Sequence, residues 1–314
     1  MMPDGMDGFI AVTDYGWYTK LSRSKEPRDA NFWRPSARAF RLPVGTPFIF
    51  KLKKPHDAIA GFGFFAGFSV LPDWLAWETF GEANGVDDLE ALRARLHRIR
   101  EGARIEADPS GRIGCCLIAE TRFFPPERWL TPPRDWGRTT QTGDTYDLAT
   151  GEGQRIWQEC LARAATQPSP QLQAPAAGQG DEAQYGEPTL YRPRLGQGIF
   201  RVQVLDAYGR ACAVTGEHSL PVLEAAHIKP YAFGGVHDVT NGLVLRSDLH
   251  RLFDRGYITI DEDNRLLVGD LLKADYENGR SYYGLKGTPL ALPEQPSHRP
   301  SHEALAWHRE HFLG

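Results

Sequence analysis

Four polar residues in one short stretch have side chains suited to hydrolysing a phosphate ester. His227, Asn241, His250 and Asp254 all lie between Leu223 and Asp254. An imidazole takes up a proton near neutral pH, so a histidine can act as the general base for an attacking water. An imidazole and a carboxylate are also common ligands of a divalent metal ion, which stabilises charge on a phosphate. The stretch therefore predicts a metal-assisted hydrolase site.

Two of these residues need a helix to bring them together. The sequence SDLHRLFDRG at 247–256 predicts a short helix that ends at Gly256. His250 and Asp254 are four residues apart and so share one face of that helix. The apolar residues that point toward the core are Leu249, Leu252 and Phe253. We therefore expect the polar face to bind the metal.

The general base needs a strand that ends beside that helix. Residues 211–228 predict two short strands joined by a loop, with His227 near the end of the second. Residues 238–245, DVTNGLVL, predict a loop. Strand alternation puts Glu224 and His227 on opposite faces, which makes Glu224 a weak candidate ligand. His237 is expected to be a solvated bystander on the loop.

The segments CAVTG, LEAAHI, NGLVL and LHRLFD together resemble the HNH endonuclease family, in particular the subgroup seen in predicted bacterial restriction endonucleases. The resemblance implies a ββα-metal fold in which His227 is the general base and Asn241 organises the loop. It implies that His250 and Asp254 are metal ligands. Many members of the family carry a metal-binding Asp or His where this chain has Ala226, so one ligand is missing or comes from elsewhere.

The same resemblance implies a cofactor and a product. The cofactor is a divalent ion, Mg²⁺ or Mn²⁺ in the first place, with Zn²⁺ or Ni²⁺ as alternatives. Cleavage leaves a 5′-phosphate and a 3′-hydroxyl.

Basic and amide side chains around this site are candidates for holding the DNA backbone. Arg194, Gln197 and Arg201 precede the hairpin, and Arg251 lies on the predicted helix. Two alternatives stay open. The segment before the hairpin packs as a brace through Phe200 and its apolar neighbours, and Arg251 merely solvates the helix.

Composition divides the chain of 314 residues into two domains and a linker. Residues 166–189 are rich in Pro, Gln, Ala and Gly without periodicity, which is typical of a linker. We expect a first domain at 1–165 and an HNH nuclease domain at 190–314. The fold class is predicted to be α+β.

The first domain alternates strand patterns with a helix. Residues 9–18, 47–55, 58–71 and 112–124 predict strands, and 87–102 predict a helix. The layout of PFIFKL followed by IAGFGFF resembles the PUA-like superfamily, which includes EVE, ASCH and SRA domains. That resemblance implies a small β-barrel that binds RNA or a flipped, modified base.

Clustered aromatic residues give this domain a candidate base pocket. Trp17, Trp33 and Phe64 are the residues proposed to line it. The alternative is that these rings fill the core of the barrel.

Charge, cysteines and hydropathy limit the partners and the compartment. The net charge is −4, yet residues 1–54 contain ten Lys and Arg against five Asp and Glu, so a local patch can meet a polyanion. None of the four cysteines forms a Cys-x-x-Cys pair, which argues against a zinc knuckle. No apolar stretch is long enough for a membrane helix. We expect a cytoplasmic protein whose partner is DNA and not a membrane.

The sequence thus leads to one main hypothesis and two alternatives. The main hypothesis is a metal-dependent DNA endonuclease for modification-dependent restriction or anti-phage defence. The first alternative is an effector nuclease whose first domain senses a small signal molecule or an invader protein. The second is a non-catalytic nucleic-acid-binding protein with a decayed ββα fold, an idea supported only by Ala226. A homodimer is expected because one such site cuts one strand.

Overall fold

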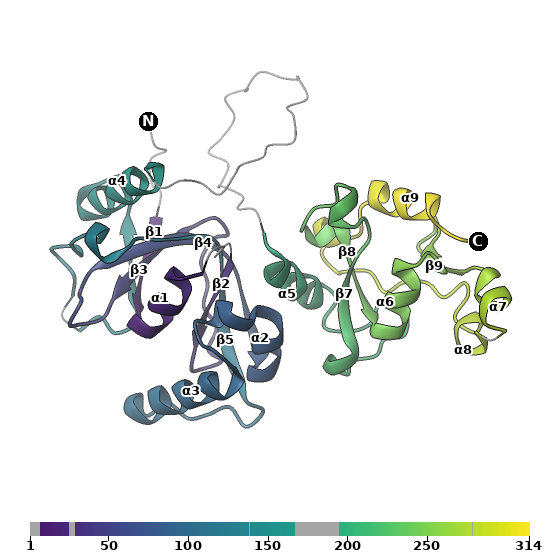
Figure 1. Ribbon diagram of the computed structural model, residues 1–314, viewed down its shortest axis with the longest axis horizontal. Coiled ribbons are helices and arrows are strands. Elements are labelled where there is room, and N and C mark those ends of the chain that lie inside the picture. Colours follow the sequence, from purple (N-terminus) through teal and green to yellow (C-terminus); the bar gives the residue numbers. More distant parts are fainter. Residues whose placement is uncertain (1–6, 25–28, 138, 167–194, 278) are drawn as a thin grey trace, which may run out of the picture. The chain divides into compact units, whose positions relative to one another are not determined.

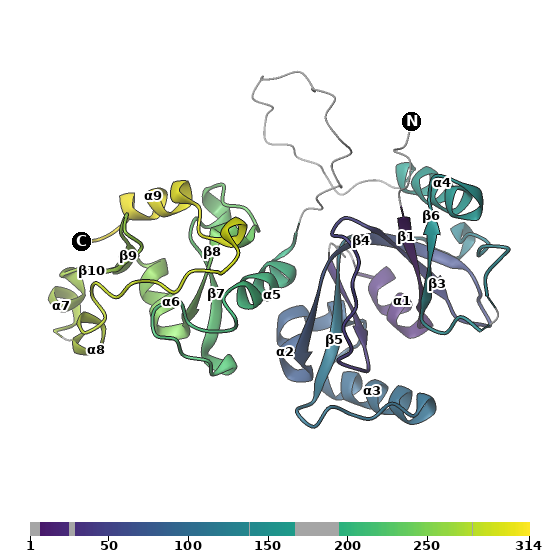
Figure 2. The same cartoon turned by 180° about the vertical axis from the view of Figure 1, so that it is seen from behind.

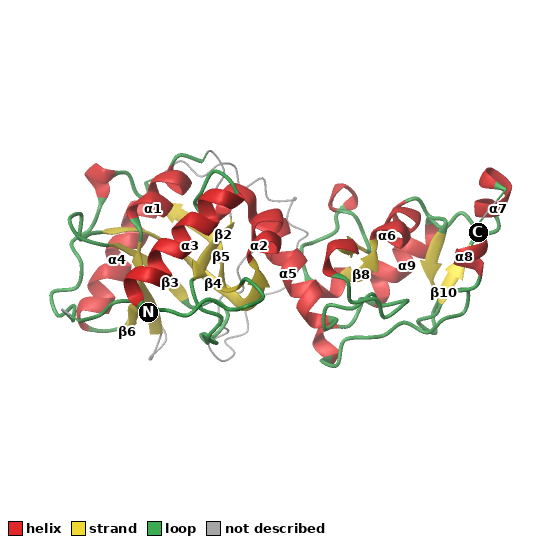
Figure 3. Cartoon of the chain, turned by 90° about the horizontal axis from the view of Figure 1, so that it is seen from below, coloured by secondary structure: helices red, strands yellow, loops and turns green. Residues whose placement is uncertain are grey.

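The computed structural model describes residues 7–24, 29–137, 139–166, 195–277 and 279–314. The chain divides into two units, Met1–Arg194 and Leu195–Gly314, each with its own sheet and core. Apart from Thr166, the linker predicted at 166–189 lies outside the described residues, and so does Arg194. Both units combine helices with strands (Figure 3), which confirms the predicted α+β class.

The first unit is built around a six-stranded sheet with the order β2-β5-β4-β3-β1-β6. Only β1 and β3 pair in parallel; the other pairs are antiparallel. The strands are β1 (Asp7–Thr13), β2 (Asp29–Arg34), β3 (Pro47–Leu52), β4 (Ile59–Pro72), β5 (Arg112–Phe123) and β6 (Gly143–Asp147). A closed barrel is not confirmed, because β2 and β6 are the two edge strands and do not pair with each other in the described residues.

Helices cover both faces of this sheet (Figure 1). Phe48 and Phe50 of β3 face a core that includes Trp17 of α1, whereas Ile49 faces a second core that includes Trp157 of α4. This division follows from the alternation of side chains along a strand. The helices are α1 (Tyr15–Ser22), α2 (Asp73–Phe80), α3 (Leu89–Ala103) and α4 (Gly151–Ala165).

The predictions for this unit hold for most elements and fail for one. The strand predicted at 9–18 stops at Thr13, because the side chain of Asp14 accepts hydrogen bonds from the backbone N–H groups of Gly16 and Trp17 and caps α1. β4 is bulged, with register shifts on its β5 side between Phe62 and Phe64 and again farther along.

The second unit contains a β-hairpin against a helix. β7 (Leu223–His227) pairs in antiparallel fashion with β8 (Gly242–Arg246), and α6 (Ser247–Asp254) packs on both strands. α5 (Gln197–Ala207) also contacts both strands of the hairpin (Figure 2). The remaining elements are β9 (Ile258–Ile260), β10 (Leu266–Val268), α7 (Leu271–Tyr276), α8 (Arg280–Tyr283) and α9 (His302–Glu310).

Two predictions for the hairpin are wrong. Residues 211–228 contain one strand, not two. The first predicted strand is a turn, and the backbone N–H of Ala213 donates to the carbonyl of Val244 from that turn and not from a strand. The second strand is β8, which was predicted as a loop. Its apolar run GLVL is buried at every position, as in a strand covered on both faces.

All four cysteines are buried, and none of them forms a disulfide within the described residues, in keeping with a packing role. The part of the chain that the structure describes contains no helix long and apolar enough to cross a membrane.

Candidate active site

His227 lies at the end of β7, where the hairpin opens toward α5. Its ring stacks on Phe200 of α5, with centroids 4.0 Å apart and planes 12° from parallel. Its Nε2 lies 3.0 Å from Nδ1 of His237. The imidazole is therefore held both across its face and at one nitrogen.

The surroundings of His227 favour its neutral form. Its pKa is lowered to about 4, first by burial and then by electrostatic repulsion from His237 and His250 when they are protonated, while Asp254 acts in the opposite sense. The imidazole is thus unprotonated at neutral pH, as a general base must be. These charge effects also show that His227 lies in the same electrostatic neighbourhood as the α6 residues.

Asn241 holds the loop between β7 and β8 from inside. Its side chain is buried, and its Oδ1 accepts from the backbone N–H of Lys229 at 2.9 Å. Its Nδ2 donates to the carbonyls of Lys229 and Val236, both at 2.9 Å. An amide can do this because it carries donor and acceptor on one rigid group. The two ends of the loop are thereby tied to one side chain.

The loop itself turns tightly and returns His237 to the site. A Cβ on Gly235 would come within 1.8 Å of the carbonyl oxygen of Lys229, so only glycine fits there. Tyr231 then stacks on His237, with planes 7° apart. The prediction that His237 is a solvated bystander is wrong, because its ring is half-buried between Tyr231 and His227.

α6 places His250 and Asp254 on one face, as the spacing predicts. His250 Nε2 lies 3.4 Å from Oδ2 of Asp254, and His250 Nδ1 donates to Oε2 of Glu224 at 2.5 Å. Burial lowers the pKa of His250, but the hydrogen bonds and charges of Asp254 and Glu224 outweigh it, so that the net shift is upward. Two carboxylates thus flank one imidazole.

Glu224 contacts His250, although strand alternation makes it only a weak candidate ligand. It does face away from His227 along β7, but that side of the strand is the side on which α6 packs. Glu224 shares this side with Ala226, which is fully buried. A carboxylate is therefore present two residues before the position where the family pattern led us to expect a ligand.

The donor set fits a divalent cation by its chemistry. The candidate ligands are the imidazole of His250 and the carboxylates of Asp254 and Glu224. An imidazole is a borderline ligand and a carboxylate a hard one, and Mn²⁺, Mg²⁺ and Zn²⁺ accept such ligands. No group of three or more His, Cys, Asp and Glu side chains in the described residues is arranged to hold an ion. Glu224 contacts Nδ1 of His250, and Asp254 lies near its Nε2.

The predicted DNA contacts occupy different surroundings. Gln197 is exposed at the start of α5, and Arg251 is exposed on α6. Arg201 is half-buried on α5, and its buried Nε has no hydrogen-bond partner among the described residues. Arg194 lies outside those residues. The structure leaves two predicted contacts in solvent and one with an unsatisfied donor.

The predicted base pocket in the first unit is wrong for Trp17. This ring is 3% exposed, and Phe50 packs against it at 5.2 Å between centroids, so it belongs to the core. Trp33 donates through Nε1 to the carbonyl of Asn84 at 2.8 Å. Phe64 packs in the other core, against Trp157. The three residues therefore do not line one cavity.

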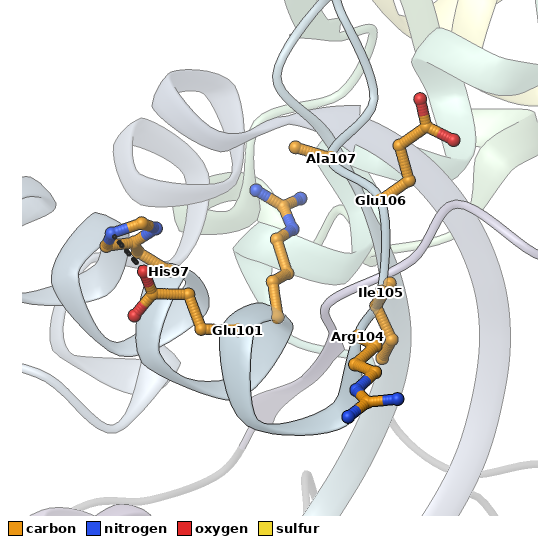
Figure 4. Close-up of a pocket in the computed structure, with 7 residues that line it drawn as sticks. His97, Glu101, Arg104, Ile105, Glu106 and Ala107 are labelled. Carbon is orange, nitrogen blue, oxygen red and sulfur yellow. Dashed lines mark ion pairs between the residues drawn. The ribbon is translucent and has the colours of Figure 1, made fainter.

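A shallow depression lies at the end of α3 instead (Figure 4). His97 and Glu101 form an ion pair of 3.3 Å at its rim. The other residues around it are Arg100, Arg104, Ile105, Glu106 and Ala107. It contains none of the aromatic residues proposed to read a base.

The hairpin and α6 lie in a segment that matches a known family model. Residues 212–261 match the family model described as HNH endonuclease. This match confirms the predicted HNH domain for this part of the chain. No curated protein matches the chain.

Three solved structures resemble the chain at low identity. One is a modification-dependent TagI restriction endonuclease, with 13% identity and a TM-score of 0.30 over 86% of this chain. The chain spans 62% of that protein's length. The others are two variants of ZmASCH from Zymomonas mobilis, 12% identical, with TM-scores of 0.31 and 0.32. They cover 48% and 50% of this chain, and 96% and 98% of their own.

Proposed function

We propose that this protein is a metal-dependent DNA endonuclease that serves modification-dependent restriction or defence against phage. The observation that carries the proposal is the pairing of an unprotonated, stacked His227 with the donor face of α6 inside an HNH domain. A general base next to metal-binding side chains is the arrangement that hydrolysis of a phosphodiester requires.

In the proposed reaction His227 takes a proton from the attacking water. The water oxygen forms a bond to phosphorus, the bond to the 3′ oxygen breaks, and that oxygen leaves as a hydroxyl after it gains a proton from solvent. Asn241 keeps the loop in place, and His237 stays bonded to the base. His250, Asp254 and Glu224 are the residues that would hold the divalent ion, whose charge stabilises the phosphate and the leaving oxygen.

Glu224 takes the place of the ligand expected at Ala226. Both residues lie on the side of β7 that faces α6. Glu224 comes two residues before Ala226, and its longer side chain reaches His250. The buried alanine fills the core, where a carboxylate would be desolvated.

DNA is held in this proposal by α5 and α6. The guanidinium of half-buried Arg201 and the exposed side chains of Gln197 and Arg251 are the groups of this unit that would contact the DNA backbone. The first unit selects the target, as the sequence resemblance to PUA-like domains implies. No pocket residues are assigned there.

A cleavage panel tests the proposal. The full chain is incubated with unmodified, methylated, hydroxymethylated and glucosylated DNA, in the presence of Mg²⁺, Mn²⁺, Zn²⁺, Ni²⁺ or a chelator. We expect one modified substrate to be cut to ends with a 5′-phosphate, only with metal, and His227→Ala to lower the rate by at least about 100-fold.

Each rival function has its own outcome in the same panel. Cleavage of unmodified DNA only after a nucleotide signal is added would favour the effector nuclease. DNA binding without cleavage under any condition, and without metal binding by calorimetry, would favour a non-catalytic protein. Full activity of His227→Ala would remove the assignment of the base.

A further inference from the structure

His237 contacts the candidate base directly, although its position in a loop marked it as a bystander. Its Nδ1 lies 3.0 Å from Nε2 of His227, which is a hydrogen-bond distance. Since both rings are half-buried and both pKa values are lowered by burial, the contact joins two neutral imidazoles at neutral pH.

A hydrogen bond between two neutral imidazoles has two possible directions. Each ring carries one N–H and one lone pair, so one ring donates and the other accepts. If His237 donated, the hydrogen of His227 would sit on Nδ1, and neither of its nitrogens could take a proton from water. If His227 donates through Nε2–H, the lone pair remains on its Nδ1. Only the second direction lets His227 act as a base.

We propose that His237 is a positioning residue that accepts the Nε2–H of His227 and so keeps the lone pair of His227 on Nδ1, the atom that deprotonates the attacking water. This inference rests on the proposed nuclease function. The proton from water moves to Nδ1 of His227, and His237 gains and loses no proton. It remains the acceptor for the imidazolium that forms.

The loop is built to hold this acceptor in place. Tyr231 stacks on the ring of His237, and Phe200 stacks on that of His227. Asn241 binds the carbonyl of Val236, the residue before His237. The role of Asn241 therefore extends through the loop to the tautomer of the base, as outer partners of a catalytic histidine commonly act.

Kinetics with paired variants of the full chain test the proposal. His237→Ala removes the acceptor, and His237→Asn replaces Nδ1 with a side-chain oxygen near the same position. We expect Ala to lower kcat by about 10- to 100-fold with an unchanged KM for DNA, and Asn to restore most of kcat. His218→Ala, an exposed histidine of the same unit, is the control. Unchanged kcat in His237→Ala, or no rescue by Asn, would overturn the assignment.

Nitrogen-15 NMR of labelled histidines provides a measurement that needs no substrate. We expect His227 to show the Nε2–H tautomer in the unaltered chain and a mixture of tautomers in His237→Ala. A predominant Nδ1–H tautomer in the unaltered chain would refute the inference even if the protein cuts DNA. If the protein cuts nothing, the nuclease proposal fails, while this spectrum still tests the pair.

Discussion

Glu224 is the carboxylate that we propose in place of the ligand expected at Ala226. Its Oε2 lies 2.5 Å from Nδ1 of His250 and approaches the imidazole from β7, while Asp254 approaches the same imidazole from α6. A metal ion at this proposed site would compete with these contacts for a nitrogen of the imidazole. Glu224 and Asp254 would then be ligands of the ion, and we expect the loss of either carboxylate to lower the affinity for the metal.

We expect Glu224→Gln to weaken Mn²⁺ binding by at least about 10-fold, because an amide oxygen carries no net charge to attract the ion. Calorimetric titration of the full chain measures the affinity. Glu262→Gln is the matched control, since that side chain is 89% exposed on the same unit. Equal affinities for the two variants would place the metal elsewhere.

At the scale of elements, α5 carries both the packing and the proposed DNA contacts. Phe200, Val204 and Leu205 point into the core of the second unit, as one alternative for this segment predicted. Arg201 follows Phe200 on the same helix, and its buried Nε has no hydrogen-bond partner among the described residues. The two interpretations of this segment are therefore compatible on one helix.

Arg201→Gln should weaken DNA binding and reduce its dependence on salt. The loss of one phosphate contact lowers the slope of log K against log salt by about 1. Fluorescence anisotropy in the His227→Ala background measures both values on uncut DNA. Arg210→Gln is the control, because Arg210, just past the end of the same helix, is paired with Asp206 at 2.9 Å. An unchanged slope for Arg201→Gln would exclude the contact.

α9 is linked to α6 through a buried histidine. His308 Nε2–H donates to the carbonyl of Phe253 at 3.0 Å, and its Nδ1 accepts from the hydroxyl of Thr259 at 2.8 Å. Its pKa is lowered to about 4, chiefly by burial and in part by His311, while the carbonyl of Phe253 and the charge of Asp254 act in the opposite sense. The neutral ring is thus a structural link between α9, α6 and β9.

The stability of the second unit should fall as pH drops from 6.5 toward 4. In the unfolded chain the imidazole has its ordinary pKa of 6.5, so over this range the unfolded state binds a proton that folded His308 does not. Relative to neutral pH, the protonation equilibrium of His308 alone lowers the free energy of unfolding by about 2 kcal/mol at pH 5. Hydrogen exchange of amides in 195–314 at pH 7.5 and pH 5 measures it.

The control for this prediction lies on the same helix. His308→Gln should remove only the part of the pH dependence of stability that His308 causes. A remainder is expected because burial also lowers the pKa of His227 and His237. His302→Gln, at the exposed start of α9, should match the unaltered chain at both pH values. A pH dependence in His308→Gln as large as in the unaltered chain would contradict the assignment.

At the scale of the whole molecule, the chain has two units and one HNH match, at residues 212–261. One such site hydrolyses one phosphodiester bond at a time, while a double-strand break requires two. We propose that two chains act together on a target that the first unit selects. This arrangement confines the nuclease to DNA on which both copies assemble.

Plasmid cleavage should then proceed through a nicked circle whose conversion to linear DNA rises with protein concentration. Gel analysis over time measures the two products. Addition of His227→Ala chains to the active protein should increase the nicked circles at the expense of linear DNA, because mixed pairs carry one working site. A ratio of nicked to linear product that stays constant at all concentrations would contradict pairing.

The sequence by itself determined the HNH domain, the helix that carries His250 and Asp254, and the α+β class. These features depend on local spacing: residues four apart share a helical face, and an apolar pattern that stops at Gly256 indicates where the helix ends. The same local logic failed where a side chain had two options. Asp14 capped a helix where the β-propensity of its neighbours predicted a strand, and β8 was taken for a loop because Asn241 and Gly242 mark a turn.

Only the tertiary structure decided which distant residues meet. The contact of Glu224 with His250 spans 26 residues, and the packing of Trp17 against Phe50 removed it from any pocket. His237 reached His227 because Asn241 closes the loop from inside, a bond that no spacing rule encodes. Strand and helix periodicity specify the face on which a residue lies, whereas the partner on that face depends on how the elements pack.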